Sequence, residues 1–298
     1  MIKALKWIGI ILGILVGLVV IAIAAVYFIA EEKLTTVYDL PAAQIIVPND
    51  PQVIERGKHL VTAVVLCDGC HGKDYSGELI DEGPLIGRIV MSNLTGGKGG
   101  IGGKYTDADW ERALRHGVRP DGRALLLMPS SVFYFLSNSD VAAIIAYLNS
   151  LPPVDNDLPK TKLGILGRLF VLQDPALLSA ALINHNAPRP PAVEPAASKE
   201  YGEYLANVCK NCHGNDLAGG EQVDSGVNLT PGDELAHWTY DDFIQVMRFG
   251  LKPDGTQLDG EKMPWPSFQN MNDIELEALW LFLQSLPPVE SKVEASQP

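Results

Sequence analysis

The sequence predicts an all-α protein, in which an N-terminal transmembrane helix precedes two tandem copies of one small helical domain. Three observations lead to this prediction. Residues 7–30 contain no charged side chain, and a series of landmarks in residues 67–154 returns in the same order in residues 209–289. Apolar residues within each copy recur at spacings of three and four, whereas no segment shows the long apolar-polar alternation that is typical of strands.

The apolar run of residues 7–30 is dominated by Ile, Leu, Val, Ala and Gly. As a helix it is about 35 Å long, which is enough to cross a hydrocarbon core of about 30 Å. Two lysines precede the run and two glutamates follow it, so the positive-inside rule predicts a cytoplasmic N-terminus. We therefore expect a single-span anchor at residues 1–32 in the cell (inner) membrane, with the rest of the chain on the periplasmic side.

A cleaved signal peptide is the competing interpretation of this run. The segment Ala22–Ala24 resembles the small-residue site at which such peptides are cut. The apolar run is longer than the usual length of about 7 to 15 residues in that class. Its length therefore favours a retained helix.

The formal charge of −13 is distributed unevenly. Residues 199–298 hold 6 Lys and Arg against 17 Asp and Glu, whereas residues 50–154 hold 10 against 12. An acidic second half disfavours nucleic acid as a partner and favours a docking protein with a basic face. A solvated acidic surface that only aids solubility is the alternative interpretation.

Two strings of the form Cys-x-x-Cys-His use all four cysteines: CDGCH at residues 67–71 and CKNCH at residues 209–213. Four further landmarks follow each string in the same order, namely Asn-Leu-Thr (93–95, 228–230), Pro-Asp-Gly (120–122, 253–255), Met-Pro (128–129, 263–264) and Leu-Pro-Pro-Val (151–154, 286–289). So many matched landmarks indicate a duplicated domain. We place the copies at residues 50–154 and 199–290.

Each copy has the signals of helices. Thr106 and Thr239 are expected N-caps, with acidic residues in the turns that follow. Apolar residues three and four apart predict a final helix in each copy, over residues 141–148 and 276–286, and a Pro-Pro pair then ends it.

Residues 155–198 have no twin in the repeat. Their apolar part, residues 163–183, predicts two short helices broken at Pro175, and the Pro-rich stretch from Pro188 predicts an extended linker. We expect the apolar part to pack internally. Contact with the membrane or with a partner subunit is the alternative.

The Cys-x-x-Cys-His string is the pattern of c-type haem attachment. Cysteines three apart lie on one side of a helix, where both sulfurs can form thioethers with one porphyrin while the following histidine ligates the iron. The two strings predict two covalently attached haem c groups, held by Cys67, Cys70 and His71, and by Cys209, Cys212 and His213. A thioredoxin-like redox site would need a βαβ context that is missing, and a zinc site would need the cysteines or nearby histidines to converge.

Two methionines occupy matching positions, each before a proline. Met128 and Met263 lie 57 and 50 residues after the histidines of the two strings. This matching predicts that they are the sixth iron ligands, with core packing as the alternative. Met/His ligation closes both faces of the iron to substrate and so favours electron transfer.

Two arginines also match, and three histidines do not. Arg115 and Arg248 could each pair with a haem propionate, or form an ordinary salt bridge. His59, His116 and His237 have no histidine twin. We expect them to be surface or packing residues, with displacement of Met128 by His59 or His116 as the alternative.

The order of CxxCH, Asp-Gly, Met-Pro and a terminal helix ending in Leu-Pro-Pro resembles the class I cytochrome c fold. Over about residues 50–290, the two copies and their apolar connector resemble the membrane-bound dihaem cytochromes c related to the cytochrome subunits of bacterial alcohol dehydrogenases. Those dehydrogenase subunits carry three CxxCH strings and this chain carries two. The resemblance implies two tandem class I cytochrome c domains, with His71–Met128 and His213–Met263 as the axial pairs.

The expected function is therefore single-electron relay between a respiratory or other membrane or periplasmic donor complex and an acceptor such as a terminal oxidase or a soluble carrier. The chain would be an electron-transfer protein, alone or within an oxidoreductase complex, and not itself an enzyme. Two alternatives remain. A dihaem peroxidase would need one iron with an open site, and a haem-bearing structural or sensor subunit would need no electron partner.

Overall fold

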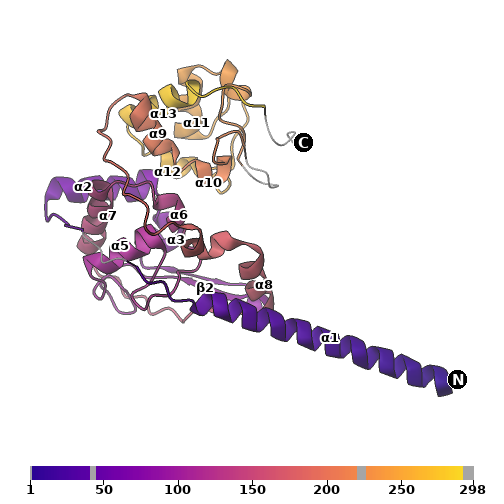
Figure 1. Ribbon diagram of the computed structural model, residues 1–298. Helices are drawn as coiled ribbons and strands as arrows, with labels where there is room; N and C mark the ends of the chain where they lie inside the picture. The colour runs from indigo at the N-terminus through magenta and orange to yellow at the C-terminus, as the bar shows by residue number, and fades with distance from the viewer. Residues whose placement is uncertain (1, 41–44, 220–225, 291–298) are drawn as a thin grey trace.

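The computed structural model describes residues 2–40, 45–219 and 226–290. Its elements in chain order are α1 (Ile2–Thr35), α2 (Pro51–His59), the π-helical turn η1 (Leu60–Val64), α3 (Asp68–His71), β1 (Glu78–Asp81), α4 (Gly83–Ile86), β2 (Gly87–Met91), α5 (Asp107–His116), α6 (Ser130–Phe133), α7 (Asn138–Ser150), β3 (Lys162–Leu163), α8 (Ile165–Gln173), the 3₁₀ helix η2 (Pro175–Leu182), α9 (Lys199–Ala206), α10 (Lys210–His213), the 3₁₀ helix η3 (Glu234–His237), α11 (Tyr240–Phe249), α12 (Trp265–Phe268) and α13 (Asp273–Gln284). Figure 1 shows α1 projecting from one body, α2 to η2, with α9 to α13 in a second body beside α2 and α7. We call these bodies the first and second units.

Helix α1 is exposed along most of its apolar length, and Ala30 near its C-terminal end is buried. Its stretch Leu5–Thr35 is long and apolar enough to cross a membrane, with a mean hydropathy of 3.1 in its most apolar window. The chain joins the first unit directly after the helix. The amide N–H of Tyr38 donates to the carbonyl of Gly122 at 2.8 Å, and Val37 forms an isolated β-bridge with Arg123.

One helix crossing organises each unit. α2 packs across α7 in the first unit, and α9 packs across α13 in the second. A side chain on Gly57 would overlap the carbonyl of Ala143, and one on Gly202 would overlap the carbonyl of Ala278. Glycine at both positions therefore lets the paired backbones approach closely.

The sequence landmarks make the same contacts in both units. The amide of Asn93 donates to the carbonyl of Val154 at 2.8 Å, and that of Asn228 donates to the carbonyl of Val289 at 2.7 Å. The Asn-Leu-Thr segment thus fastens the Leu-Pro-Pro-Val segment that leaves the final helix. The landmarks that repeat in the sequence therefore form equivalent contacts in the two units.

Helices α5 and α11 confirm the predicted N-caps. Thr106 and Thr239 each accept a bond from the backbone of the third helical residue, an aspartate whose carboxylate binds back to the cap. Both helices end at a glycine in the left-handed conformation, Gly117 and Gly250. The final helices α7 and α13 also lie where the apolar spacing predicted them.

A small antiparallel sheet departs from the prediction of an all-α chain. β1 pairs with β2 from Glu78↔Met91 to Asp81↔Arg88, and β2 pairs with β3 through Gly87↔Leu163. The strands are four, five and two residues long, and none is buried. These strands are too short to show an alternation of apolar and polar residues, which is why sequence patterning did not predict them.

The connector forms two short helices broken at Pro175, as predicted. α8 packs on α1 and α4, and η2 packs on α6. Leu178 and Ala180 of η2 join Val118 and Val171 in a small second core. One side of the apolar connector therefore packs internally.

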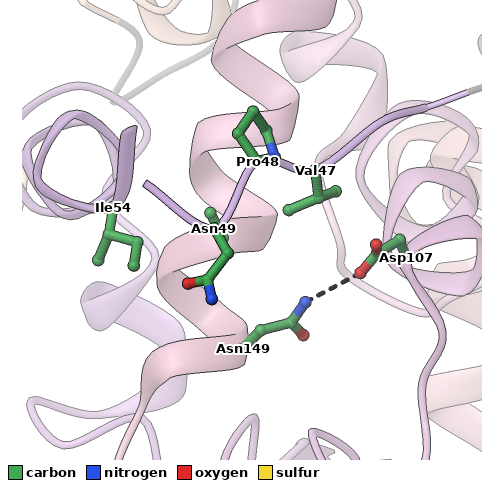
Figure 2. A pocket seen from close by; sticks show the side chains of 7 residues that line it. Val47, Pro48, Asn49, Ile54, Asp107 and Asn149 are labelled. Carbon is green, nitrogen blue, oxygen red and sulfur yellow. Dashed lines mark hydrogen bonds between the residues drawn. The ribbon is translucent and has the colours of Figure 1, made fainter. Parts of the chain in front are cut away.

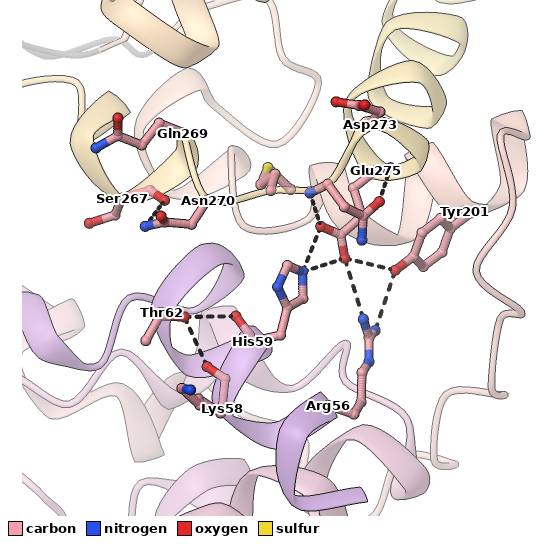
Figure 3. A network of polar contacts seen from close by, with 12 residues as sticks. Arg56, Lys58, His59, Thr62, Tyr201, Ser267, Gln269, Asn270, Asp273 and Glu275 are labelled. Atoms are coloured by element: carbon pink, nitrogen blue, oxygen red, sulfur yellow. Dashed lines mark hydrogen bonds and ion pairs between the residues drawn. The ribbon is translucent and has the colours of Figure 1, made fainter. Parts of the chain in front are cut away.

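A buried polar network joins the two units (Figure 3). Glu275 of α13 is fully buried, and it receives bonds from His59 Nε2 at 2.7 Å and from the Tyr201 hydroxyl at 3.2 Å. Arg56 of α2 lies 3.3 Å from Glu275 and 3.1 Å from Asp140 of α7. Burial acts to raise the pKa of Glu275, but the bond from His59 and the nearby charges hold it below its ordinary value. The carboxylate is thus ionised and fastens the second unit to the first.

Candidate functional site

The first CxxCH string forms one helical turn after a sharp bend. Leu66 adopts the left-handed conformation, with φ 54°, and the helical turn follows it. The amide N–H groups of Cys70 and His71 donate to the carbonyl of Cys67 at 3.3 and 2.9 Å. The turn places the two cysteine side chains on the same side of the chain.

The second string repeats this turn. The amide N–H groups of Cys212 and His213 donate to the carbonyl of Cys209 at 3.2 and 2.9 Å. Gly214 follows with φ 80°, as Gly72 follows the first string with φ 78°. Each string is therefore a rigid turn ending in a histidine.

All four cysteines are free thiols. Cys67 is buried and Cys209 is half-buried, while Cys70 and Cys212 are exposed. Burial raises the pKa of Cys67 and of Cys209 to about 12. Redox-active CxxC motifs instead have lowered thiol pKa values, so these turns differ from a thioredoxin-like site.

The two histidines are prepared to bind a metal through Nε2. The Nδ1 of His71 lies 2.8 Å from the carbonyl of Ser92, and that of His213 lies 2.6 Å from the carbonyl of Val227. A carbonyl can only accept, so Nδ1 carries the proton and Nε2 keeps its lone pair. Burial lowers the pKa of both imidazoles, which keeps them neutral.

Close packing fixes the ring of His213. A Cβ atom on Gly226 would lie 2.6 Å from His213 Nδ1, so the backbone can pass here only as glycine. The hydrogen bond to Val227 and this contact hold the same side of the ring. The imidazole therefore has little freedom to turn.

Met128 lies half-buried against the main apolar cluster, which includes Cys67. Its carbonyl accepts a bond from the Ser179 hydroxyl at 2.6 Å. Leu127 before it has φ 64°, and its amide donates to the carbonyl of Leu177 at 2.9 Å. The connector helix η2 thus braces the Met128 loop, which sequence reasoning did not anticipate because the connector has no twin.

Met263 lies half-buried against the same cluster, as does Cys209. Its amide donates to the carbonyl of Asp259 at 2.9 Å, and its carbonyl accepts from the amide of Trp265 at 2.7 Å. Side-chain bonds within the same loop add to these: the Trp265 indole donates to the Leu258 carbonyl at 3.1 Å, and Asp259 Oδ1 accepts from the Glu261 amide at 2.9 Å. The two methionine loops are therefore supported differently.

Both matched arginines fasten the loop before the final helix. Arg115 is fully buried and donates to the Leu136 carbonyl and to Asn138 Oδ1, each at 2.8 Å. Arg248 donates to the Met271 carbonyl at 2.6 Å and to Asp273 Oδ1 at 2.8 Å. These hydrogen bonds hold both guanidinium groups against the loop that precedes the final helix.

The unmatched histidines occupy other surroundings. His116 is buried, with its Nδ1 2.9 Å from His185 Nδ1 and its Nε2 3.2 Å from Arg189. It is a packing residue, as expected. His59 belongs to the network around Glu275, a contact that no local pattern in the sequence indicates.

A small recess lies away from these residues (Figure 2). Its walls are formed by Val47, Pro48, Asn49, Ile54, Asp107, Ala146 and Asn149. Asn149 donates to Asp107 across it at 2.9 Å. No cysteine, methionine or histidine of the predicted sites lines it.

The donor atoms do not suit a zinc site. Across residues 2–40, 45–219 and 226–290, no three His, Cys, Asp or Glu side chains come together as a metal-binding group. A tetrahedral zinc site needs four such ligands. Each CxxCH turn instead contributes two thiols and one imidazole from a single stretch of chain.

Comparison with known proteins agrees with these observations. The family described as Cytochrome c matches residues 54–152. The chain is 28% identical over 281 residues to the cytochrome c subunit of alcohol dehydrogenase (quinone) from Gluconacetobacter polyoxogenes, a match that covers 80% of this chain and 57% of the relative. It is 26% identical to the fructose dehydrogenase cytochrome subunit of Gluconobacter japonicus, covering 82% of this chain and 54% of that protein. It is also 26% identical to a dihaem c-type cytochrome of Cereibacter sphaeroides, covering 75% and 83%. The chain thus spans a little over half the length of the dehydrogenase subunits.

Proposed function

We propose that this chain, which contains a cytochrome c domain and resembles the cytochrome c subunits of alcohol dehydrogenases, is a membrane-anchored dihaem cytochrome that relays single electrons. The observation that carries the proposal is the pair of CxxCH turns, each with free thiols and a neutral histidine oriented through Nδ1. The proposed domains are residues 50–154 and 199–290, joined by residues 155–198. Residues 1–32 are the proposed anchor.

The residues of each turn fit a covalent haem c. Cys67 and Cys70, and likewise Cys209 and Cys212, would attach the porphyrin, and His71 and His213 would be the proximal ligands. Each haem would supply a reversible one-electron iron couple.

The chain's own groups would tune these centres. The carbonyls of Ser92 and Val227 hold the histidine rings and strengthen Nε2 as a ligand. Met128 and Met263 are the proposed sixth ligands, and by closing the second face of each iron they would exclude water and peroxide. Arg115 and Arg248 would stabilise the loops beside the final helices rather than carry the reaction.

The relatives favour relay over peroxidase chemistry. The names of those reported above describe cytochrome subunits of dehydrogenases and a dihaem cytochrome. The proposed donor is accordingly a dehydrogenase in a larger membrane complex, and the proposed acceptor is a quinone, an oxidase or a soluble carrier. The haem domains would face the periplasm, and the acidic second half would meet a partner with a basic face.

Expression in a host with c-type haem maturation tests the proposal. Intact mass after denaturation should exceed that of the polypeptide by two haems, and the ferric spectrum should be entirely low-spin. A mass equal to the bare polypeptide would contradict covalent attachment. A high-spin haem that reacts with cyanide or peroxide in the unmodified protein would favour the peroxidase.

Methionine variants test the sixth ligands. Met128→Ala and Met263→Ala should each convert one haem of two to a ligand-reactive form and lower its reduction potential, because methionine ligation raises the potential. Met91→Ala is the matched control, since Met91 lies in β2 and has no methionine twin. An unchanged spectrum in either variant would remove that methionine from the site.

A further inference from the structure

Helix α8 lies against the end of α1 that enters the first unit. The Nη1 atom of Arg168 is 2.7 Å from Glu31 Oε2, and its guanidinium carbon is 4.1 Å from the centre of the Tyr27 ring. Ala30, between these two residues of α1, is fully buried. α8 is therefore level with residues 27–31.

Aromatic residues of α1 mark where the edges of a bilayer would lie. Trp7 and Tyr27 are exposed and 20 residues apart, which is about 30 Å along a helix. This distance equals the thickness of a typical hydrocarbon core, and Trp and Tyr favour its two boundaries. If α1 spans a membrane, Tyr27 lies at the lipid headgroups, and so does α8.

The outer surface of the first unit is apolar at this level. Leu166 and Phe170 of α8 are 38% and 46% exposed, and Leu85 of α4, which packs on α8, is 61% exposed. Arg168 is the one charged residue among Ile165–Gln173. Its charge is already matched by Glu31 and stacked on Tyr27, so burying this surface in lipid would leave no unpaired cation.

We propose that α8 and α4 form an interfacial membrane contact, in which Leu85, Leu166 and Phe170 insert among lipid headgroups and upper acyl chains. The first unit then rests on the bilayer instead of standing away from it. The inference depends on the proposed function only in requiring that α1 spans a membrane.

Continuity with α1 identifies the occupant as lipid. The patch is contiguous with the span through Arg168, and it lies at the depth where that span leaves the hydrocarbon. Charges of both signs border the patch: Asp81 and Glu82 precede α4, Arg88 follows it, and Lys162 precedes α8, so attraction to anionic lipid would not dominate the contact. Burial of apolar surface would hold it, and the contact is therefore expected to persist at high salt.

Site-directed spin labelling of the full chain tests the contact. Leu166→Cys and Phe170→Cys would be labelled with a nitroxide in phosphatidylcholine nanodiscs. Val16→Cys reports the centre of the span, and the exposed Phe249→Cys of α11 reports water. Accessibility to oxygen, which partitions into lipid, is compared with accessibility to a water-soluble nickel complex.

The labels at Leu166 and Phe170 should favour oxygen over nickel severalfold, at a depth between those of Val16 and Phe249, in low and high salt alike. Labels that match Phe249 while Val16 remains in lipid would overturn the contact and leave the anchor intact. A label at Val16 that is open to nickel would refute the anchor and the contact together. Water-exposed labels that become shielded only when another subunit co-purifies would assign the surface to a protein partner and overturn the lipid contact.

Discussion

The surroundings of His116 strongly disfavour the protonated form of its imidazole. Burial, then Arg189 and His185 from the connector, then Arg115 and Arg112 of its own helix, lower the pKa of His116 to about 4 from an ordinary value of 6.5. Glu111 offsets some of this positive charge through its ion pair with Arg189 at 2.9 Å. The imidazole is therefore neutral in the folded protein at neutral pH.

This depressed pKa predicts a loss of stability in mild acid. Between about pH 6.5 and 4 the unfolded chain binds a proton at His116 and the folded chain does not, so the free energy of unfolding falls as pH falls, by at most about 3 kcal/mol. His116→Gln should flatten this part of the pH profile, measured by guanidinium unfolding at several pH values. The exposed His237→Gln is the control, and identical slopes in His116→Gln and the unmodified protein would contradict the prediction.

The brace on Met128 gives a second prediction for one residue. Ser179→Ala removes the bond to the Met128 carbonyl and should reduce stability by about 1 kcal/mol. If Met128 ligates iron, the near-infrared methionine-iron band of one haem should also be lost at lower temperature. Ser285→Ala, which removes a hydroxyl bond on the helix surface, should change neither; equal effects of both variants would show that the brace has no specific role.

Residue types and spacing were sufficient to predict the CxxCH turns and the helix caps, because each depends on neighbours within a few positions. The bonds of His59, Arg56 and Ser179 join residues between 51 and 219 positions apart. No local pattern encodes such contacts. The matched arginines were found by the repeat, but only the structure shows that they bind the loop before each final helix.

At the level of elements, the helix crossings depend on two glycines. Gly57→Ala and Gly202→Ala would each force a methyl group against a carbonyl of the facing helix, at a cost of about 1–3 kcal/mol. Gly96→Ala is a fair control because the nearest atom to its new methyl would be 3.9 Å away. Thermal unfolding by circular dichroism would compare the three, and a tolerated alanine at Gly57 or Gly202 would show that the crossing can relax.

The apolar periodicity predicted α7 and α13, since each buries one face, whereas the apolar composition of residues 163–183 and its break at Pro175 predicted the two connector helices. It did not predict the sheet, because β3 belongs to the connector and pairs with β2 from more than 70 residues away. Gly87, with φ 105°, allows the close approach of these strands. The pairing of β2 with β3 is thus a tertiary contact between the first sequence repeat and the connector.

At the level of the whole molecule, the network around Glu275 fixes how the two units meet. Glu275→Gln keeps an oxygen for the capping bond to Asn272 but removes the charge opposite Arg56 and His59. Breaking a buried pair costs about 3–5 kcal/mol. The units should then separate, which small-angle scattering would detect as a larger radius of gyration and limited proteolysis as faster cleavage within residues 187–198.

Glu277→Gln is the control for this experiment, because Glu277 lies exposed on the same helix. Separation in both variants would point to a general loss of charge, and separation in neither would show that apolar packing alone joins the units. If two haems are present, Glu275→Gln should also slow electron exchange between them.

The exit of α1 has a mechanical consequence. Glu31 and Tyr38 are each bonded to the first unit, on either side of the point where the helix ends. No flexible linker separates α1 from the first unit, so a rotation of the helix about its long axis would rotate the first unit with it. Suppose that a neighbouring protein binds α1 inside the bilayer. One residue inserted between that binding site and Glu31 would rotate the first unit by about 100° about the helix axis relative to the neighbour. An insertion of seven residues, which is close to two full turns, would return the first unit to nearly its original orientation.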